Sequence, residues 1–243
     1  MAGFHGSAAT WLSACGILPD KHYLGLFGRS KAKPLSPAQQ HRMKNLLPSL
    51  GLGSGQLSPK QLWPQAQQVW VEIGIGGGEH FVHQASQNPN IHLIGFEPFQ
   101  NGMAKTLGAV ERLQLQNISL EMTDARDVLA RFEDHSIDRM FILYPDPWPK
   151  RRHWKRRLIE PVFIAELARL MKPGAQIRFV SDIAHYQQWA LWHFLRHPDF
   201  EWQAQTCSDW QRAPADHCTT KYEQKAFREK RHPAYLHFIR KGL

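Results

Sequence analysis

The stretch that decides the fold of this chain reads Val69-Trp-Val-Glu-Ile-Gly-Ile-Gly-Gly-Gly-Glu79. Residues 69–73 form a short apolar run typical of a buried strand, and residues 79–87 have helical spacing. Four glycines within five positions separate the two elements. Because glycine has no Cβ, a turn of this kind lets the backbone approach a bound ligand closely. The stretch therefore predicts a ligand-binding turn at the carboxyl end of a buried strand.

The alternation of short apolar runs with helical stretches continues toward the C-terminus. The elements expected there are strands at residues 92–97, 118–122, 139–144 and 175–180, and helices at residues 100–115, 125–131, 161–171 and 186–196. Two more β runs, at residues 200–205 and 234–239, follow with a long polar loop between them. Such alternation is typical of βαβ units, which build a parallel sheet. We therefore predict an α/β, Rossmann-like fold whose seven-stranded, mostly parallel sheet has helices on both faces.

Residues 1–65 differ from the rest of the chain in composition. Six prolines lie in this region, and proline at that density prevents long helices. One short helix is expected at residues 37–47, with Ser36 as its cap and Pro37 in the first position. We predict an irregular basic arm at residues 1–65 and one domain at residues 66–243. The basic segment 28–33 is either a solvated tail or an RNA-contacting arm.

The glycine turn distinguishes between two classes of cofactor. A dinucleotide fingerprint reads G-x-G-x-x-G, and counted from Gly74 its third glycine would stand where this chain has Glu79. A carboxylate there would repel a pyrophosphate, which disfavours a nicotinamide dehydrogenase. The pattern that fits is acid-x-G-x-G-x-G, in which Glu72 precedes Gly74 and Gly76. Such a turn suits a ligand that carries an ammonium and a sulfonium, as S-adenosylmethionine does.

Acids also stand at the ends of the next two predicted strands. Glu97 lies 23 residues after Gly74, where a carboxylate can accept hydrogen bonds from both ribose hydroxyls. Asp124 follows the third strand and can reach an adenine amino group, while Ala125 leaves room for the ring. Because ligands bind at the carboxyl ends of such sheets, we expect these residues to surround one cofactor. A solvated strand-end carboxylate is the plainer alternative for Glu97.

The fourth predicted strand ends in a rigid turn, Tyr144-Pro-Asp-Pro-Trp-Pro-Lys150. Prolines on both sides of Asp146 stiffen the backbone and fix the direction of its carboxylate. Six lysines and arginines then fall within eight residues, with Trp148 and Trp154 close by. Cations interleaved with aromatic rings suit phosphate contacts and base stacking, although a solvated basic face is the default. The formal net charge of +9 and the pI of about 9.6 likewise favour a polyanionic partner.

On these motifs the chain resembles the bacterial tRNA (guanine-N7-)-methyltransferases, from about Phe27 to Lys241. The most specific match is the Pro145-Asp-Pro-Trp148 turn with the basic segment after it, and Thr220-Lys-Tyr-Glu223 matches as well. The resemblance implies a class I methyltransferase fold, S-adenosylmethionine as cofactor with S-adenosylhomocysteine as product, and tRNA as partner. The implied activity is methyl transfer to N7 of a guanine in the tRNA variable loop, which forms 7-methylguanosine. Pro149 stands where the family usually has histidine.

The resemblance also implies roles for individual residues, with Asp146 as the catalytic one. The residues implied to bind the cofactor are Glu72, Gly74, Gly76, Glu97, Asp124, Ala125 and Asp146. Those implied to contact the substrate are Lys150, Asp182, Thr220, Lys221, Tyr222 and Glu223. Those implied to contact RNA are Arg151, Arg152, His153, Lys155, Arg156 and Arg157.

Other features bound the function further. The three cysteines, Cys15, Cys207 and Cys218, form no C-x-x-C pair, so we expect neither a disulfide framework nor a metal site. No apolar run is long enough to cross a bilayer, and we expect a cytoplasmic protein without a membrane partner. Two alternatives stay open: a methyltransferase for another RNA or a small molecule, and a catalytically inactive RNA-binding relative. Monomer and homodimer both remain open.

Overall fold

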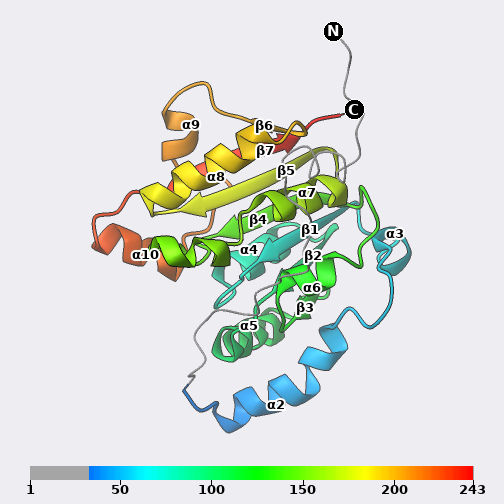
Figure 1. Ribbon diagram of the computed structural model, residues 1–243. Coiled ribbons are helices and arrows are strands. Elements are labelled where there is room, and N and C mark those ends of the chain that lie inside the picture. Colours follow the sequence, from blue (N-terminus) through cyan, green and yellow to red (C-terminus); the bar gives the residue numbers. More distant parts are fainter. Residues whose placement is uncertain (1–32, 243) are drawn as a thin grey trace.

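The computed structural model describes residues 33–242, which form a seven-stranded sheet flanked by helices (Figure 1). The strands are β1 (Gln68–Ile73), β2 (Ile91–Phe96), β3 (Ile118–Glu121), β4 (Ile137–Leu143), β5 (Met171–Ser181), β6 (Phe200–Trp202) and β7 (Ala234–Arg240). They lie in the order β3-β2-β1-β4-β5-β7-β6, with β1 to β5 parallel and β7 antiparallel to both of its neighbours. The order reverses between β1 and β4, the point where open sheets of this kind bind ligands.

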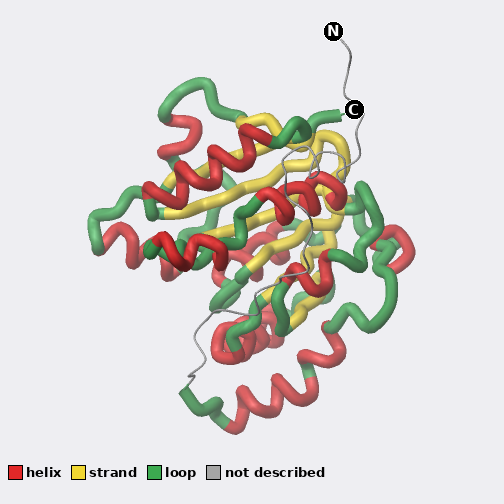
Figure 2. The backbone as a smooth tube through the Cα atoms, in the orientation of Figure 1, coloured by secondary structure: helices red, strands yellow, loops and turns green. Residues whose placement is uncertain are grey.

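Each face of the sheet packs against its own set of helices (Figure 2). Successive residues of a strand point to opposite faces, so Val71 joins one core and Trp70 joins the other. The Val71 core is covered by α6 (Ala125–Leu129), α7 (Pro161–Leu170) and α8 (Ala184–Arg196), and the Trp70 core by α4 (Glu79–Gln87) and α5 (Gln100–Leu113). Burial on both faces explains why the central strands read as continuous apolar runs.

The predicted first helix is present as α2 (Pro37–Asn45). The hydroxyl of Ser36 accepts a hydrogen bond from the amide of Gln39, and the Gln39 side chain accepts one from the amide of Ser36. α2 lies against α5, where Nε of Arg42 donates to Glu111 at 2.7 Å. The predicted Ser36 cap is therefore present, and the reciprocal bond from the Gln39 side chain adds to it.

The rest of the segment before β1 also packs against the domain. Two short helices, η1 (Leu47–Leu50) and α3 (Pro59–Leu62), follow α2, as expected of a proline-rich stretch. Leu52 and Leu57 are buried in the Val71 core, so this part of the predicted arm contributes to the domain interior. The proposed boundary between residues 65 and 66 stays a prediction. The basic segment 28–33 lies outside the described residues apart from Lys33.

Most predicted elements begin and end within two or three residues of the observed ones, and β5 is the exception. It starts at Met171, four residues before the predicted start, so Pro173 and Gly174 lie inside the strand. The pairing of β4 with β5 shifts register between Ile137 and Arg139, and Gly174 has a φ of +82°. Extra residues on β5 therefore bulge opposite β4, which strand periodicity does not reveal.

Two helices lie in the region predicted to be a polar loop, α9 (Ser208–Gln211) and α10 (Lys221–Arg228). α10 buries only Glu223 and Ala226, so no apolar stripe marks it in the sequence. A signal was nevertheless present, because Thr220-x-x-Glu223 has the form of a capping box. The hydroxyl of Thr220 accepts a hydrogen bond from the amide of Glu223 at 3.2 Å.

The close packing around Gly95 of β2 yields a first prediction. A Cβ at Gly95 would lie 2.6 Å from the Phe81 ring of α4 and 3.0 Å from Leu120 of β3. We expect Gly95→Ala to lower the free energy of unfolding by about 1–3 kcal/mol, because both neighbours belong to the core. Gly108→Ala in α5 is the control, since its nearest foreign atom would be 3.7 Å away. Urea unfolding followed by circular dichroism makes the comparison, and equal midpoints would contradict the packing argument.

Candidate active site

One cavity of about 580 Å³ lies at the carboxyl ends of β1 to β4, beside the point where the strand order reverses. Most of the predicted cofactor-binding residues line it: Gly74, Gly76, Glu97, Asp124, Ala125 and Asp146. Later parts of the chain complete its wall through Lys221 and Tyr222 of α10 and through Arg156. The structure thus brings together strand ends that lie far apart in the sequence.

The turn after β1 requires glycine for conformational and for packing reasons. Gly74, Gly76 and Gly78 have φ values of +77°, +57° and +78°, which L side chains rarely adopt. A Cβ on Gly102 of α5 would lie 2.6 Å from the carbonyl oxygen of Gly76. α5 therefore packs directly on the backbone of the turn and fixes its position at the cavity edge.

Glu97 joins this turn to the end of β2. One carboxylate oxygen accepts from the amide of Gly76 at 2.6 Å, and the other accepts from the amide of Phe99 at 2.8 Å. Burial raises the pKa of Glu97, although the two amides and the charge of Lys221 act in the opposite direction. Each oxygen keeps a lone pair beyond these bonds, so the carboxylate can also accept from a ligand diol.

Asp124 caps α6 at the end of β3. Its carboxylate accepts from the amide of Arg126 at 3.0 Å and from the guanidinium of the same residue at 3.0 and 2.7 Å. Burial raises the pKa of Asp124, but the bonds from Arg126 outweigh it and hold the pKa below its usual value. Asp124 therefore stays ionised beside the buried Ala125. The adenine contact expected of this pair stays a prediction.

Asp146 lies on the proline-rich turn after β4. Tyr144 and Trp148, one on each side, have φ values of +52° and +41°, a region that side chains of this size rarely occupy. The Asp146 side chain is open to solvent through the cavity, yet the protein around it removes enough hydration to raise the pKa of its carboxyl. Two non-glycine residues in the left-handed region indicate that contacts from outside the turn hold it.

Glu72 is not among the residues that line the cavity. Its side chain lies on the same face of β1 as Trp70 and is 2% exposed. Its carboxylate lies 2.7 Å from Nδ1 of His80, the second residue of α4. The pair fastens α4 to β1 behind the glycine turn. The predicted cofactor contact of Glu72 remains a prediction, and in this structure the side chain supports the turn from behind.

The predicted substrate residues lie at different depths. Lys221 and Tyr222 are exposed and line the cavity, with the Lys221 ammonium 5.1 Å from the centre of the Tyr222 ring. Lys150 is exposed just before the basic segment. Thr220 caps α10 and is buried. Only two of these four side chains therefore face the cavity directly.

Glu223 and Asp182, the other two predicted substrate residues, already have protein partners. The Glu223 carboxylate is buried, contacts Nε2 of His217 at 2.6 Å and accepts a hydrogen bond from the hydroxyl of Tyr235. The carboxylate of Asp182 accepts from Nε of Arg231 at 2.6 Å. These bonds fix the direction of α10 relative to β7 and to the start of α8.

A group of residues that sequence reasoning missed holds the segment before α10. The carboxylate of Asp216 accepts from Arg139 of β4 at 2.8 Å and from Arg178 of β5 at 2.6 Å. The carbonyl of Asp216 accepts from Nε2 of Gln84 on α4 at 2.6 Å. A signal was available, because arginines within apolar strand runs need an acidic partner.

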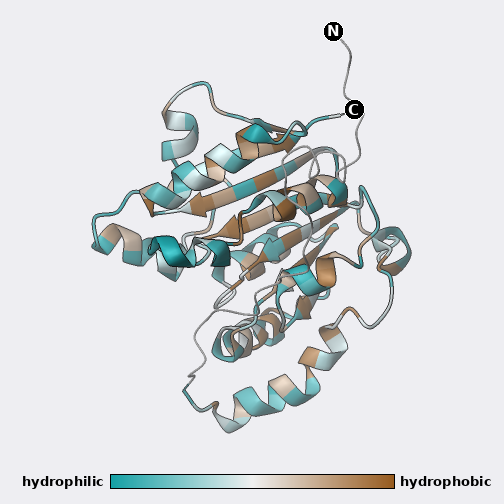
Figure 3. Cartoon of the chain, viewed as in Figure 1, coloured by the Kyte–Doolittle hydropathy of each residue, from teal (hydrophilic) through white to brown (hydrophobic). Residues whose placement is uncertain are grey.

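The basic segment forms η2 (Arg151–Arg156), seen as the deep teal helix in Figure 3. Arg151, Arg152 and Lys155 are exposed on it. The guanidinium of Arg156 lies 5.1 Å from the centre of the Trp148 ring, so η2 borders the cavity. The helix therefore presents cations to solvent next to the turn that carries Asp146.

Two other members of the predicted RNA-contacting set differ from this pattern. The His153 ring is partly exposed and packs edge-on against Trp148, with ring centres 5.9 Å apart. Arg157 is 1% exposed and points inward. The predicted RNA contact of Arg157 remains a prediction, and in this structure its guanidinium is directed into the protein.

Known proteins match this chain over nearly all of the described residues. Residues 66–236 match a family described as "Putative methyltransferase". A tRNA (guanine-N(7)-)-methyltransferase of Caulobacter sp. (strain K31) is 46% identical over 214 residues, which cover 88% of this chain and 94% of that protein. One from Rhodospirillum rubrum is 44% identical over 222 residues, covering 88% and 87%. The chain belongs to the tRNA (guanine-N(7)-)-methyltransferase family.

Solved structures of other methyltransferases resemble the fold of this tRNA (guanine-N(7)-)-methyltransferase family member. The 16S rRNA methyltransferase KamB gives a TM-score of 0.51 at 14% identity and covers 75% of this chain and 92% of its own. The aminoglycoside resistance methyltransferase NpmB1 gives 0.50 at 15% identity, covering 76% and 94%. These likenesses confirm the predicted Rossmann-like class I methyltransferase fold.

Two kinds of feature are absent from residues 33–242. In that part of the chain no helix is long and apolar enough to cross a membrane. In the same part, no group of three or more histidine, cysteine, aspartate or glutamate side chains is placed to hold a metal ion.

The ion pairs of Asp216 yield a second prediction. Asp216→Asn removes the ion-pair partner of Arg178, whose side chain is 3% exposed, and should lower the free energy of unfolding by about 1–3 kcal/mol at neutral pH. Burial raises the pKa of Asp216, but Arg178 and Arg139 hold it below its usual value. The carboxylate therefore stabilises the fold above the ordinary aspartate pKa, and this contribution is lost as the pH falls through the lowered pKa.

Urea unfolding of wild type and variant at several pH values measures this effect. Asp134→Asn is the matched control, because Asp134 pairs with Arg169 at the surface and surface pairs contribute less than about 1 kcal/mol. The difference between wild type and Asp216→Asn should shrink toward acid pH. A difference that is constant with pH, or no larger than that of the control, would contradict the role given to Asp216.

Proposed function

We propose that this protein transfers a methyl group from S-adenosylmethionine to N7 of a guanine in tRNA, forming 7-methylguanosine. The observation that carries the proposal is that Asp146 and Arg156 line one cavity. An acid for a cationic cofactor and a basic helix for RNA thus meet at one edge of the sheet. The names of relatives about 45% identical to the chain support the same substrate.

The residues around the cavity fit S-adenosylmethionine. A Cβ on Gly76 would lie 3.4 Å from the Tyr222 ring, so the turn leaves space there that side chains would otherwise fill. Glu97 has free lone pairs for a ribose diol. Asp124 and Ala125 line the part of the cavity in which we expect the adenine to bind. When bound, the cofactor supplies an electrophilic methyl group on a positively charged sulfur.

Asp146 would act by position and charge. Guanine N7 carries a lone pair and no proton, so it would accept the methyl group without a general base from the protein. The leaving thioether would keep the electron pair of the carbon–sulfur bond, and the positive charge would pass to the purine. A carboxylate fixed at this edge of the cavity favours that cationic ring and holds the reacting groups in line.

Base recognition would fall to the residues that face the cavity. Lys221 and Tyr222 line it, whereas the carboxylate of Glu223 is buried with His217 and Tyr235. A contact between Glu223 and the guanine edge would require it to exchange one of these bonds. A guanine stacked inside folded tRNA must also be exposed first, which costs a few kcal/mol.

Methyl transfer into tRNA tests the proposed function. Wild-type protein with a radiolabelled donor should label tRNA, and digestion to nucleosides with mass spectrometry should find the label in 7-methylguanosine. Asp146→Asn should lower kcat/KM by about 100-fold, because it removes the charge that the reaction needs. The raised pKa of Asp146 should give the wild type an acid limb in its rate profile that the variant lacks.

Asp127→Asn, an exposed carboxylate on α6, is the matched control and should retain wild-type kinetics. Label in ribosomal RNA but not in tRNA would refute the substrate. Donor-dependent binding of tRNA without transfer would identify an inactive relative. A well-folded Asp146→Asn protein with full activity would refute the role of that residue.

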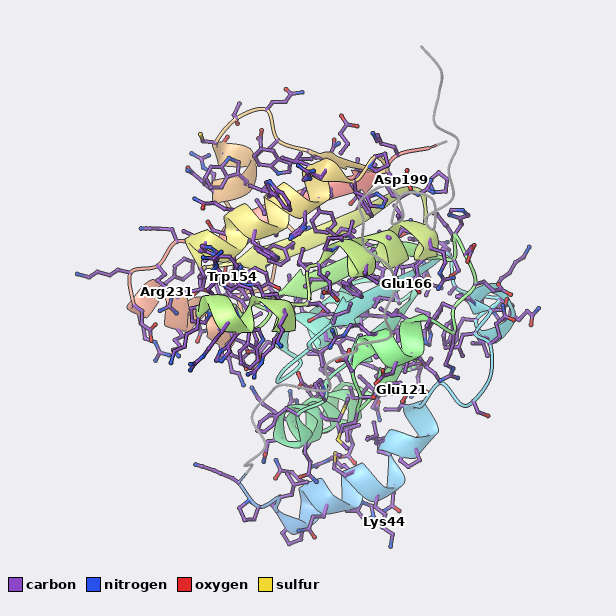
Figure 4. All side chains as sticks on the ribbon, in the orientation of Figure 1. Lys44, Glu121, Trp154, Glu166, Asp199 and Arg231 are labelled. Carbon is purple, nitrogen blue, oxygen red and sulfur yellow. The ribbon has the colours of Figure 1, made fainter. Side chains whose placement is uncertain are left out.

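The basic helix yields a separate prediction. The triple variant Arg151→Ala, Arg152→Ala, Lys155→Ala should weaken tRNA binding and flatten its dependence on salt, by about 0.7–0.9 in the logarithmic slope for each phosphate that is no longer neutralised. The control replaces three exposed cations elsewhere, Lys44, Lys60 and Arg112, by alanine. Figure 4 shows Lys44 on α2, far from Trp154 of η2. Filter binding at several salt concentrations measures both, and equal slopes would argue against η2 as the RNA contact.

A further inference from the structure

Arg157 is a buried cation that the proposed function does not use. Its side chain ranks among the largest that are fully buried, at 1% exposure. Within residues 33–242 no carboxylate forms an ion pair with it. Burial accordingly lowers the pKa of Arg157, although an arginine stays charged even so. A cation in such a place calls for a reason other than charge neutralisation.

The donors of Arg157 point at the turn that carries Asp146. Nε donates to the carbonyl of Pro147 at 2.9 Å, and one terminal nitrogen lies 3.4 Å from the carbonyl of Trp148. The same nitrogen lies 3.1 Å from Nδ1 of His185, near the start of α8. The two carbonyls belong to the residues that directly follow Asp146 in the chain.

Three aromatic rings enclose the guanidinium. Its carbon lies 5.1, 5.0 and 4.9 Å from the ring centres of Trp154, Tyr186 and Trp189. A planar guanidinium can stack on such rings and still direct its donors in a fixed fork. A lysine ammonium, with its donors at one point, can do neither as well.

The turn needs an external support of this kind. Tyr144 and Trp148 occupy the left-handed region on either side of Asp146, and this conformation persists only where surrounding contacts enforce it. The carbonyls after Asp146 receive the donors of Arg157, and the rings that hold Arg157 come from η2 and α8. Trp154, one of these rings, is labelled on η2 in Figure 4.

We propose that Arg157 is a positioning residue for methyl transfer. Its hydrogen bonds hold the turn 144–148 in one conformation and so direct the carboxylate of Asp146 into the cavity. The inference rests on the proposed function and reassigns Arg157 from RNA contact to the support of the catalytic turn. Arg157 would then contact both the turn that carries Asp146 and Trp154 of η2. The position of this exposed basic helix relative to the Asp146 carboxylate would therefore be fixed.

Kinetics of Arg157→Lys against wild type provide the first test. We expect kcat for tRNA methylation to fall 10- to 100-fold, while KM for tRNA stays within about threefold of wild type and the salt slope of tRNA binding is unchanged. The same substitution in an Asp146→Asn background should change kcat by less than threefold, because Arg157 acts through Asp146. His185→Ala, at an exposed position, is a milder variant for which we expect a smaller loss of kcat.

Hydrogen–deuterium exchange gives a second readout that needs no activity. Peptides covering residues 143–151 should exchange at least fivefold faster in Arg157→Lys, with the rest of the sheet unchanged, and Lys155→Ala should show no such increase. Unchanged exchange in residues 143–151 overturns the proposal. So does a raised KM for tRNA with a flattened salt slope and unchanged kcat, or an equal loss of kcat in the Asp146→Asn background. If exchange in residues 143–151 rises in Arg157→Lys as expected but the wild type methylates no tRNA, the proposed function is refuted instead.

Discussion

The hydrogen bond of 2.6 Å from the amide of Gly76 to the carboxylate of Glu97 is the constraint on which the cavity depends. It joins the turn after β1 to the end of β2. α5 presses on the same turn, because Gly102 has no Cβ to hold it away. With Gly74 and Gly78 also at positive φ, the backbone has little freedom left. The positions of Asp124 and Asp146 in the cavity follow from the strands that neighbour this fixed edge.

Charged side chains in the interior hold a second wall of the cavity, next to β4 and β5, in a similar way. Arg139 and Arg178 project from β4 and β5, and a guanidinium in the interior without a partner would be unfavourable. The carboxylate of Asp216 forms an ion pair with each of them, and its backbone carbonyl accepts a hydrogen bond from Gln84 on the helix after the glycine turn. The segment before α10 is therefore tied to the same helix that closes the glycine turn. Lys221 at the start of α10 reaches the cavity as a consequence.

Features that depend on local periodicity or on topology could be predicted from the sequence. Strands buried on both faces leave continuous apolar runs, and the strand ends then bring Glu97 and Asp146 to one cavity. α10 could not be predicted from apolar spacing, because a buried face containing Glu223 is stable only through partners supplied by other segments. Nor could Arg157 be distinguished from Arg156. Both are arginines in the same basic segment, and only the folded structure determines that Arg157 is the buried one.

The support that Arg157 gives to the backbone of the turn carrying Asp146 has an electrostatic consequence. In a protein with a net charge of +9, the proposed function requires an acid that is available for a cationic cofactor beside cations that contact RNA. Among the described residues no ion pair joins Asp146 to a cation, and burial raises its pKa. Had Arg157 held the turn by binding the carboxylate itself, it would have neutralised the charge that the reaction uses. By donating to the carbonyls of Pro147 and Trp148, it fixes the direction of Asp146 and leaves that charge free.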